Sequence, residues 1–134
     1  MRLVVDSSTL INALIGGRWA QFLDIVVDRG YTVYTSTVQM AELVEVVERR
    51  KFRKFFSVDE ARAAMGDFYI VAEVVPLEPP FPKVCRDAKD DHVLALAKSV
   101  RAQVLLANDK DLLVPGSYGK TRIMEPGTFM KEYL

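Results

Sequence analysis

Short runs of β-branched and large apolar residues alternate along this chain with longer stretches of helical spacing. Five such runs are predicted as strands, at residues 3–5, 31–35, 73–75, 103–107 and 121–124. Short, continuous apolar strands are typical of sheets that are covered on both faces, and strands that alternate with helices form parallel sheets. The pattern therefore predicts an α/β fold, a three-layer α/β/α sandwich with a central, mostly parallel sheet.

The stretches between these runs carry residues that begin or end helices. Ser36 and Thr37 suit a helix cap, Ser57 and Glu60 have the S-x-x-E spacing of a capping box, and Gly30 is placed to end a helix. Asp87 is expected to cap a later helix, and Pro126 suits a first helical turn. We expect helices at residues 9–15, 19–28, 37–50, 58–72 and 88–100, and a short one from 126.

The composition limits the classes of protein to consider. A chain of 134 residues, half of them hydrophobic, can bury a core as one domain covering residues 1–134. The 18 basic and 18 acidic residues cancel, so nucleic acid would have to bind through a local patch. The single cysteine, Cys85, excludes an internal disulfide and a thiolate metal cluster. With no signal peptide pattern and no apolar run near the roughly 20 residues of a membrane span, we expect a cytoplasmic protein.

Two aspartates follow predicted strands at the point where each strand ends. Asp6 comes directly after the strand at 3–5, and Asp109 follows the strand at 103–107 with only Asn108 between. The carboxyl ends of parallel strands share one edge of a sheet, where ligands bind in open α/β folds. Either aspartate alone would be read as a helix cap, but two on one edge favour a site.

Asp90 and Asp91 form an acidic pair at the start of a predicted helix. At about 100° per residue, Asp90 falls on the apolar stripe that contains Val93, and Asp91 falls on a more polar side near Lys98. An inward carboxylate needs a partner, because burying an unpaired charge is costly. A favourable interaction with the helix dipole explains an aspartate on the polar side, such as Asp91, but does not explain an inward Asp90. The lone histidine, His92, points away from the inward stripe and is expected at the surface.

Glu42 cannot be assigned from spacing alone. The apolar stripe of its helix is expected to contain Met40, Leu43, Val44 and Val47. Glu42 lies opposite that stripe, where a solvated glutamate is the ordinary interpretation. Its place early in a helix that follows the strand at 31–35 nevertheless puts it near the same sheet edge as Asp6.

Several carboxylates at one edge suit a hard divalent cation. Mg²⁺ and Mn²⁺ prefer oxygen ligands, and carboxylates that lie close together cannot all stay ionised without a cation. One or two such ions activate a water and stabilise the leaving oxygen of a phosphodiester. We therefore expect Mg²⁺ or Mn²⁺ as the cofactor, and this chemistry requires no histidine.

Four segments, in this order and spacing, resemble one family nearly end to end. They are LVVDSSTLINAL, STVQMAELVEVVERRKFRKF, CRDAKDDHVLALA and VLLANDKDLL. The sequence resembles the PIN-domain nucleases, and in particular the VapC-like toxins of toxin–antitoxin pairs. The resemblance implies a PIN-like fold and a metal-dependent endoribonuclease that hydrolyses RNA with a metal-activated water. It also implies a cognate antitoxin protein. We expect a homo-oligomer, such as a homodimer, and the sequence leaves dimer or tetramer open.

The resemblance also implies the roles of individual residues. The implied catalytic acids are Asp6, Glu42, Asp90 and Asp109. The implied metal ligands are Asp6, Asp90, Asp91, Asp109 and Asp111, with the choice between Asp90 and Asp91 as principal ligand left open. The implied supporting residues are Ser8, Asn12 and Asn108.

Two positions depart from the pattern of this family. Ser7 and Ser8 stand where Thr-Asn or Thr-Ser is usual, and the Ser8 hydroxyl can still bind a metal-bound water. Ala107 replaces a threonine whose hydroxyl usually orients the site. These departures motivate one alternative, a PIN-like module with weakened catalysis that only binds a partner.

A second alternative is a phospho-acceptor receiver domain, which is also a small α/β fold with acids at strand ends. Such a domain needs a phosphorylatable aspartate after a central strand and a lysine after a later strand. Lys110 could serve as that lysine. However, no aspartate ends a strand in the middle of the chain, since Asp59 falls in the predicted capping box.

A basic segment interleaved with aromatic residues is the candidate RNA-binding surface. Its basic residues are Arg49, Arg50, Lys51, Arg53 and Lys54. Its phenylalanines, Phe52, Phe55 and Phe56, could stack on bases. The alternative is a basic helix end that the helix dipole favours. Trp19, Phe22, Phe55 and Phe56 could also line a dimer or antitoxin groove, although such residues more often belong to a core.

Overall fold

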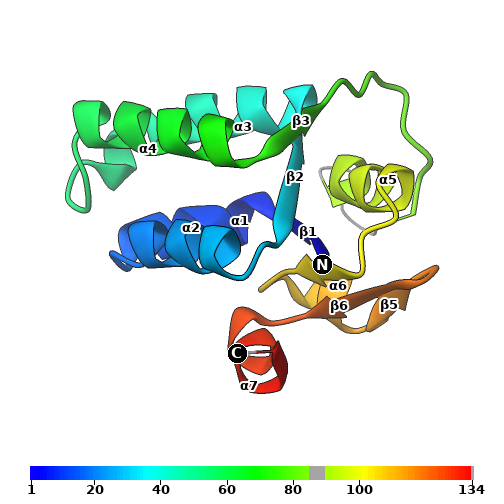
Figure 1. Cartoon of the computed structure of the whole chain (residues 1–134). Coiled ribbons are helices and arrows are strands. Elements are labelled where there is room, and N and C mark those ends of the chain that lie inside the picture. The colour runs from blue at the N-terminus through cyan, green and yellow to red at the C-terminus, as the bar shows by residue number, and fades with distance from the viewer. Residues whose placement is uncertain (85–89, 134) are drawn as a thin grey trace.

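The computed structural model describes residues 1–84 and 90–133. In chain order the elements are β1 (Arg2–Val5), α1 (Ser7–Ile15), α2 (Trp19–Asp28), β2 (Thr32–Ser36), α3 (Thr37–Val47), the 3-10 helix η1 (Arg50–Phe52), α4 (Val58–Val71), β3 (Glu73–Val75), α5 (Asp91–Ser99), β4 (Val104–Leu106), α6 (Lys110–Leu113), β5 (Ser117–Tyr118), β6 (Thr121–Met124) and α7 (Pro126–Tyr133). Cys85 and the expected cap Asp87 lie outside the described residues. Figure 1 shows the helices arranged around one twisted sheet.

The sheet of the described residues has six strands in the order β3-β2-β1-β4-β6-β5. All neighbouring pairs are parallel except β5 and β6, which form an antiparallel hairpin. The five predicted strands and the mostly parallel sheet are confirmed. β5, α6 and η1 were not predicted, because elements of two to four residues carry no measurable periodicity. The β5–β6 turn contains Gly119 at φ 58°, a conformation that favours glycine.

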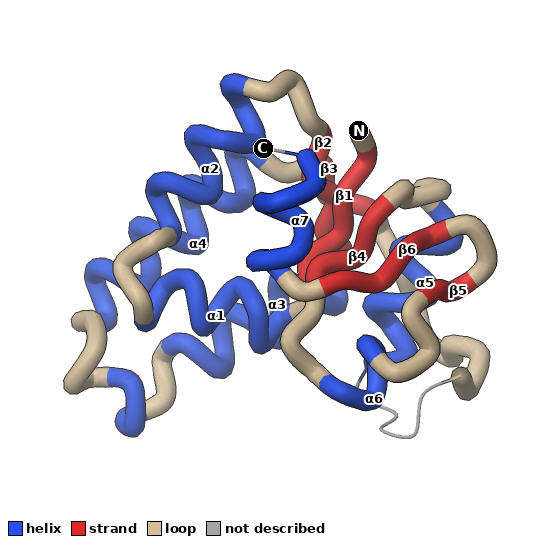
Figure 2. The backbone as a smooth tube through the Cα atoms, turned by 90° about the horizontal axis from the view of Figure 1, so that it is seen from below, coloured by secondary structure: helices blue, strands red, loops and turns tan. Residues whose placement is uncertain are grey.

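Two cores lie on opposite faces of this sheet. Leu3 and Val5 belong to the core formed with α1, α2, α3, α4 and α7, whereas Val4 between them belongs to the core formed with α5 and α6. The view from below shows the strands between these two groups of helices (Figure 2). Because side chains alternate along a strand, a strand buried on both faces must be apolar throughout. The predicted three-layer sandwich is therefore confirmed.

Local capping signals were reliable. The capping box is formed: Ser57 Oγ accepts from the Glu60 amide, and the Glu60 side chain accepts from the Ser57 amide, both at 3.0 Å. Ser36 Oγ accepts from the Gln39 amide at 3.0 Å. The predicted bounds of α2 are those observed, with Gly30 in the left-handed region at φ 65°.

The third helix is shorter than predicted. It ends at Val47 rather than near Arg50, because Arg49 adopts an extended conformation before η1. The Arg53 guanidinium turns back and donates to the Val47 carbonyl oxygen. This contact satisfies one of the carbonyls that a helix end leaves without an intrahelical partner.

No single helix in residues 1–84 and 90–133 is long and apolar enough to cross a membrane. Only α1 and α2 together pass on length and composition, and they are bent by 117° relative to each other.

Candidate active site

The carboxyl edge of the sheet brings distant parts of the chain together. The Asp6 amide donates to the Leu106 carbonyl oxygen at 2.8 Å, which extends the β1–β4 pairing to the last residue before α1. α1, α3 and α6 begin just after β1, β2 and β4, so each helix starts at this edge. Asp6 and Asp109 therefore lie on one edge, as the strand positions predicted.

Asp6 is buried but does not act as a helix cap. It is 4 % exposed and occupies the position before α1, yet its side chain makes no capping hydrogen bond. Instead, the carboxylate accepts from Ser8 Oγ at 2.5 Å. Burial raises the pKa of Asp6, and the nearby carboxylates of Asp109 and Glu42 raise it further, against the lowering effect of hydrogen bonds from Ser8 and the Ser7 backbone. Capping therefore does not explain this residue.

Asp109 has two roles at the neighbouring strand end. Its Oδ1 accepts from the Asp111 amide at 2.9 Å, so it caps α6. It is also one of the two carboxylates that raise the pKa of Asp6. Asp111 is exposed in the first turn of α6.

Glu42 faces the site rather than the solvent. Its side chain is 34 % exposed, and Oε2 lies 3.5 Å from His92 Nε2. The interpretation as a solvated glutamate was wrong, as was the inclusion of Val44 in the buried stripe, since Val44 is 44 % exposed. The reason is Gln39: this polar residue is fully buried, so the buried face of α3 runs through Gln39, Leu43 and Val47 and brings Glu42 to its margin.

The start of α5 reverses two of the predictions from periodicity. Asp91, expected on the polar side, is 5 % exposed, and its Oδ1 accepts from the Val84 amide at 3.0 Å. His92, expected at the surface, is 6 % exposed and lies 6.4 Å from the ring of Phe81. Asp90, expected on the inward stripe, precedes the helix and is half-buried.

These errors share one cause. Residues 81–84 lie against the start of this helix through the Val84–Asp91 hydrogen bond and the Phe81–His92 ring contact, so residues outside its apolar stripe are covered as well. Helical spacing describes a helix with one buried face, and the first turn of α5 is enclosed on more than one side.

Gln39 joins the strand ends around Asp6, and the sequence analysis missed it. Its Nε2 donates to the Val5 carbonyl oxygen at 2.7 Å and to Ser7 Oγ at 3.2 Å, the residues on either side of Asp6. Its Oε1 accepts from Thr35 Oγ1 at 2.6 Å. The signal available was a glutamine four residues before Leu43, on the inward side of a helix.

Glu125 was also missed. It follows β6 directly, as Asp6 follows β1, and β6 pairs with β4. The rule that identified Asp6 and Asp109 therefore applied to Glu125 as well.

The negative charges at this edge of the sheet suit a cation, but the described side chains are not already arranged as a set of metal ligands. Within residues 1–84 and 90–133, no lysine or arginine forms an ion pair with Asp6 or Asp109. In the same part of the chain, no three His, Cys, Asp or Glu side chains are grouped closely enough to hold a metal ion. Oxygen ligands and excess negative charge suit Mg²⁺ or Mn²⁺, whereas the ligand geometry is not preformed.

Comparison with known proteins identifies the family. A family model for the PIN domain matches residues 2–111. The chain belongs to the PIN domain family. PIN domains are nucleases, and this membership decides against the receiver-type alternative.

A solved structure supports the PIN fold. The chain is similar to a chain in the crystal structure of VapBC2 from Rickettsia felis bound to a DNA fragment from the promoter of these proteins, with 13 % identity and a TM-score of 0.62. The match covers 92 % of this chain and 97 % of the other. A search of curated protein sequences finds no match.

The acids that the PIN resemblance implies are partly brought together. The carboxylates of Asp109 and Glu42 both lie near enough to Asp6 to raise its pKa, although the three residues come from three segments of the chain. Asp90 and Asp91 lie at the start of α5, which packs on β1, β2 and α3. Ser8 holds Asp6 directly, Ala107 is buried, and Asn12 and Asn108 line a cavity beside the site.

The basic segment lies apart from these acids. It joins α3 to α4 at the ends of both helices that lie farthest from the sheet (Figure 1). Phe52 and Phe56 are buried and stacked with ring centroids 5.8 Å apart, so the suggestion that these two rings stack on bases was wrong. Phe55 is 47 % exposed, with Lys54 over its ring.

Trp19 and Phe22, the other aromatic residues considered for a partner groove, differ in their surroundings. Trp19 is buried against Phe68, with ring centroids 5.6 Å apart, and belongs to the core. Phe22 is partly buried and lines the cavity beside the site.

Proposed function

We propose that this PIN-domain chain is a divalent-metal-dependent endoribonuclease, the VapC-like toxin of a toxin–antitoxin pair in the cytoplasm. One observation carries the proposal: the buried carboxylate of Asp6 lies near those of Asp109 and Glu42, and no basic residue of the described chain pairs with Asp6 or Asp109. A site that gathers negative charge in this way is stabilised by a cation. Because the chain belongs to a nuclease family, such a cation would serve in the hydrolysis of a phosphodiester.

The acids at the carboxyl edge would hold Mg²⁺ or Mn²⁺. Asp6, Asp109 and Glu42 are the central candidates, and Asp90, Asp91 and Asp111 are the further ones. When bound, the ion would supply Lewis-acid chemistry, lowering the pKa of a water and neutralising charge that develops on a phosphodiester.

The residues around the acids position them. Ser8 donates to the Asp6 carboxylate, and Gln39 holds the backbone on both sides of Asp6. His92 lies within 3.5 Å of Glu42 and limits where that side chain can go. These contacts restrict Asp6 and Glu42, whereas the full set of metal ligands would form only when the ion binds.

RNA would bind through its phosphates to the basic segment. Arg50, Lys51 and Lys54 are exposed there and can neutralise a backbone. Arg49 forms an ion pair with Glu45, and Arg53 is engaged with the end of α3, so these two contribute less.

An antitoxin and a second copy of the chain are the proposed protein partners. The similar solved structure is of a VapBC2 assembly bound to promoter DNA. On this chain, α4 exposes Tyr69 by 60 % and Ile70 by 81 %, an apolar surface of the kind that protein partners cover. Analytical ultracentrifugation, alone and with the protein encoded by the neighbouring gene, tests both expectations.

Asp6→Asn tests the nuclease. We expect the purified wild type to cleave RNA in Mg²⁺ or Mn²⁺, EDTA to stop cleavage, and Asp6→Asn to abolish it while circular dichroism stays unchanged. Asp24→Asn, an exposed aspartate on α2, is the matched control and should cleave normally. An Asp6→Asn protein that still cleaves RNA contradicts the mechanism.

The second candidate is a PIN-like binding module with weakened catalysis. The buried Ala107 and the lack of a preformed three-ligand group among the described residues favour it. Calorimetry with Mn²⁺ on wild type and Asp109→Asn separates the two. A functional site loses affinity in the variant, whereas a degenerate site gives the same result for both proteins.

A further inference from the structure

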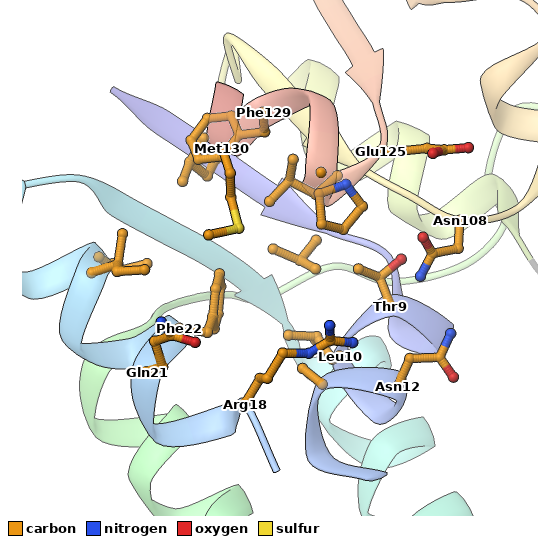
Figure 3. Close-up of a pocket in the computed structure, with 18 of the residues that line it drawn as sticks. Thr9, Leu10, Asn12, Arg18, Gln21, Phe22, Asn108, Glu125, Phe129 and Met130 are labelled. Carbon is orange, nitrogen blue, oxygen red and sulfur yellow. The ribbon is translucent and has the colours of Figure 1, made fainter. Parts of the chain in front are cut away.

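A cavity of about 320 Å³ lies between α1, α2 and α7 (Figure 3). Its floor is the face of the sheet that carries Leu3, Val5 and Leu106. Phe22 and Met130 form part of its apolar wall. A volume near 300 Å³ is at the small end of the range of ligand sites, so the cavity suits one compact group.

The polar residues of the cavity gather at one end. Thr9, Asn12 and Asn108 lie at this end (Figure 3). Thr9 is 6 % exposed, and its Oγ1 has no hydrogen-bond partner in the part of the chain that the structure describes. The exposed amides of Asn12 and Asn108 suit this end to a ligand with its own donors and acceptors.

This polar end adjoins the acidic site. Val5 and Asn108 line the cavity and directly precede Asp6 and Asp109. Consecutive Cα atoms are about 3.8 Å apart. A group at this end of the cavity therefore lies beside the backbone that carries the acids.

We propose that the cavity binds a nucleobase of the RNA, from the nucleotide next to the cleaved phosphate; this inference rests on the nuclease function proposed above. The ring of Phe22 and the thioether of Met130 offer an apolar wall to a flat heterocycle. Asn12 and Asn108 each carry a donor and an acceptor for the edge of a base.

The charge of the lining agrees with a nucleotide. Arg18 is the only basic residue among those that line the cavity, and guanidinium groups bind phosphate well. Glu125 is the only acidic one, and its carboxylate points away from the cavity in Figure 3. An apolar protein side chain would fill the wall but form no hydrogen bonds with the amides of Asn12 and Asn108.

The test titrates ¹⁵N-labelled full-length protein in EDTA with AMP, CMP, GMP and UMP, and follows amide shifts by NMR. We expect saturable shifts at Thr9, Asn12 and Asn108 with at least one nucleotide. Asn12→Ala, which removes an exposed amide of the lining, should weaken that affinity about fivefold, as expected for one lost hydrogen bond. Thr128→Val, an exposed threonine on α7 outside the lining, should leave it unchanged.

Asn108→Ala gives a second variant that does not disturb the core, because Asn108 is exposed. Its affinity for the same nucleotide should also fall. Absence of saturable shifts with all four nucleotides, or equal affinity in both variants and wild type, overturns the proposal. So would shifts at the cavity that occur only with an antitoxin protein, since the cavity would then hold a protein side chain.

The result is separable from the nuclease proposal, because the titration requires no cleavage. Nucleotide binding by a wild type that cleaves no RNA supports the cavity and contradicts the nuclease. RNA cleavage by a wild type that binds none of the four nucleotides overturns the cavity and leaves the nuclease standing.

Discussion

Asp6 is buried next to the carboxylates of Asp109 and Glu42, and this placement has a cost that depends on pH. Its pKa in the folded protein is raised above the ordinary value of 3.8. Between these two values the folded state binds more protons than the unfolded state, so stability falls as pH rises through this interval. Above the raised pKa the full penalty remains.

Asp6→Asn should therefore stabilise the metal-free protein at pH 7, because it removes a carboxyl whose ionised form the folded state disfavours. Below pH 3.8 the two proteins should differ little, since the wild-type carboxyl is then protonated in both states. Thermal unfolding in EDTA at both pH values measures this. An Asp6→Asn protein with an unchanged or lower Tm at pH 7 would show that the carboxylate is compensated in a way the described residues do not reveal.

Gln39 is the residue on which the position of Asp6 depends. Gln39→Leu keeps a similar volume but leaves the Val5 carbonyl and Thr35 hydroxyl without their partner. We expect a loss of roughly 2 kcal/mol or more in the free energy of unfolding, because two buried polar groups become unsatisfied. Chemical denaturation measures it, and Gln103→Leu, whose hydrogen bond to Arg2 is exposed, is the control.

Rate measurements separate a positioning role from mere instability. At a temperature where Gln39→Leu is folded, RNA cleavage should show a lower kcat with a nearly unchanged KM, since Gln39 does not reach the substrate. A variant with full kcat would mean that Asp6 keeps its place without Gln39.

At the scale of elements, two neighbouring basic residues beyond the end of α3, Arg53 and Lys54, make different contacts. Arg53 donates to the carbonyl oxygens of Val47 and Arg49 and lies over the Phe56 ring, whereas Lys54 is exposed. Arg53→Ala should lower the free energy of unfolding by about 2 kcal/mol, in the range for hydrogen bonds from a charged group. Lys54→Ala should change it by less than about 0.5 kcal/mol.

The two variants should rank the other way in RNA affinity, measured at low protein concentration and moderate salt: Lys54→Ala should weaken binding more than Arg53→Ala. Lys54→Ala should weaken RNA binding and reduce the salt slope by about one, as expected for one lost phosphate contact. Fluorescence anisotropy across a salt series measures it. If Lys54→Ala, Lys51→Ala and Arg50→Ala all retain the wild-type slope, the RNA follows another surface.

At the scale of the whole molecule, a bound cation would join segments that are far apart in the chain. Because the acids come from the ends of β1 and β4 and from α3, the ion binds only the folded state. At a hundred times its Kd it should add about 2.7 kcal/mol, or roughly 10 °C in Tm for a domain of this size. Thermal unfolding with and without Mn²⁺ should show this shift in wild type and Asp24→Asn, and not in Asp6→Asn/Asp109→Asn. An equal shift in the double variant would place the ion elsewhere.

Several features followed from the sequence without knowledge of the fold. The bounds of α2, the capping box at Ser57 and the parallel sheet all depend on signals within a few residues, namely apolar spacing, side-chain caps and the order of strands and helices. The same logic placed Asp6 and Asp109 at one edge, because in a parallel sheet every strand ends on the same side.

Tertiary structure alone decided which way the other side chains face. Asp91 and His92 are buried because residues 81–84, which precede them by several positions, lie against the start of α5. Glu42 reaches the site because the buried Gln39 sets the inward face of α3. Helical periodicity records which face of a helix is apolar, but not which distant segment covers the remaining faces, and that cover determines where a charged group meets its neighbours.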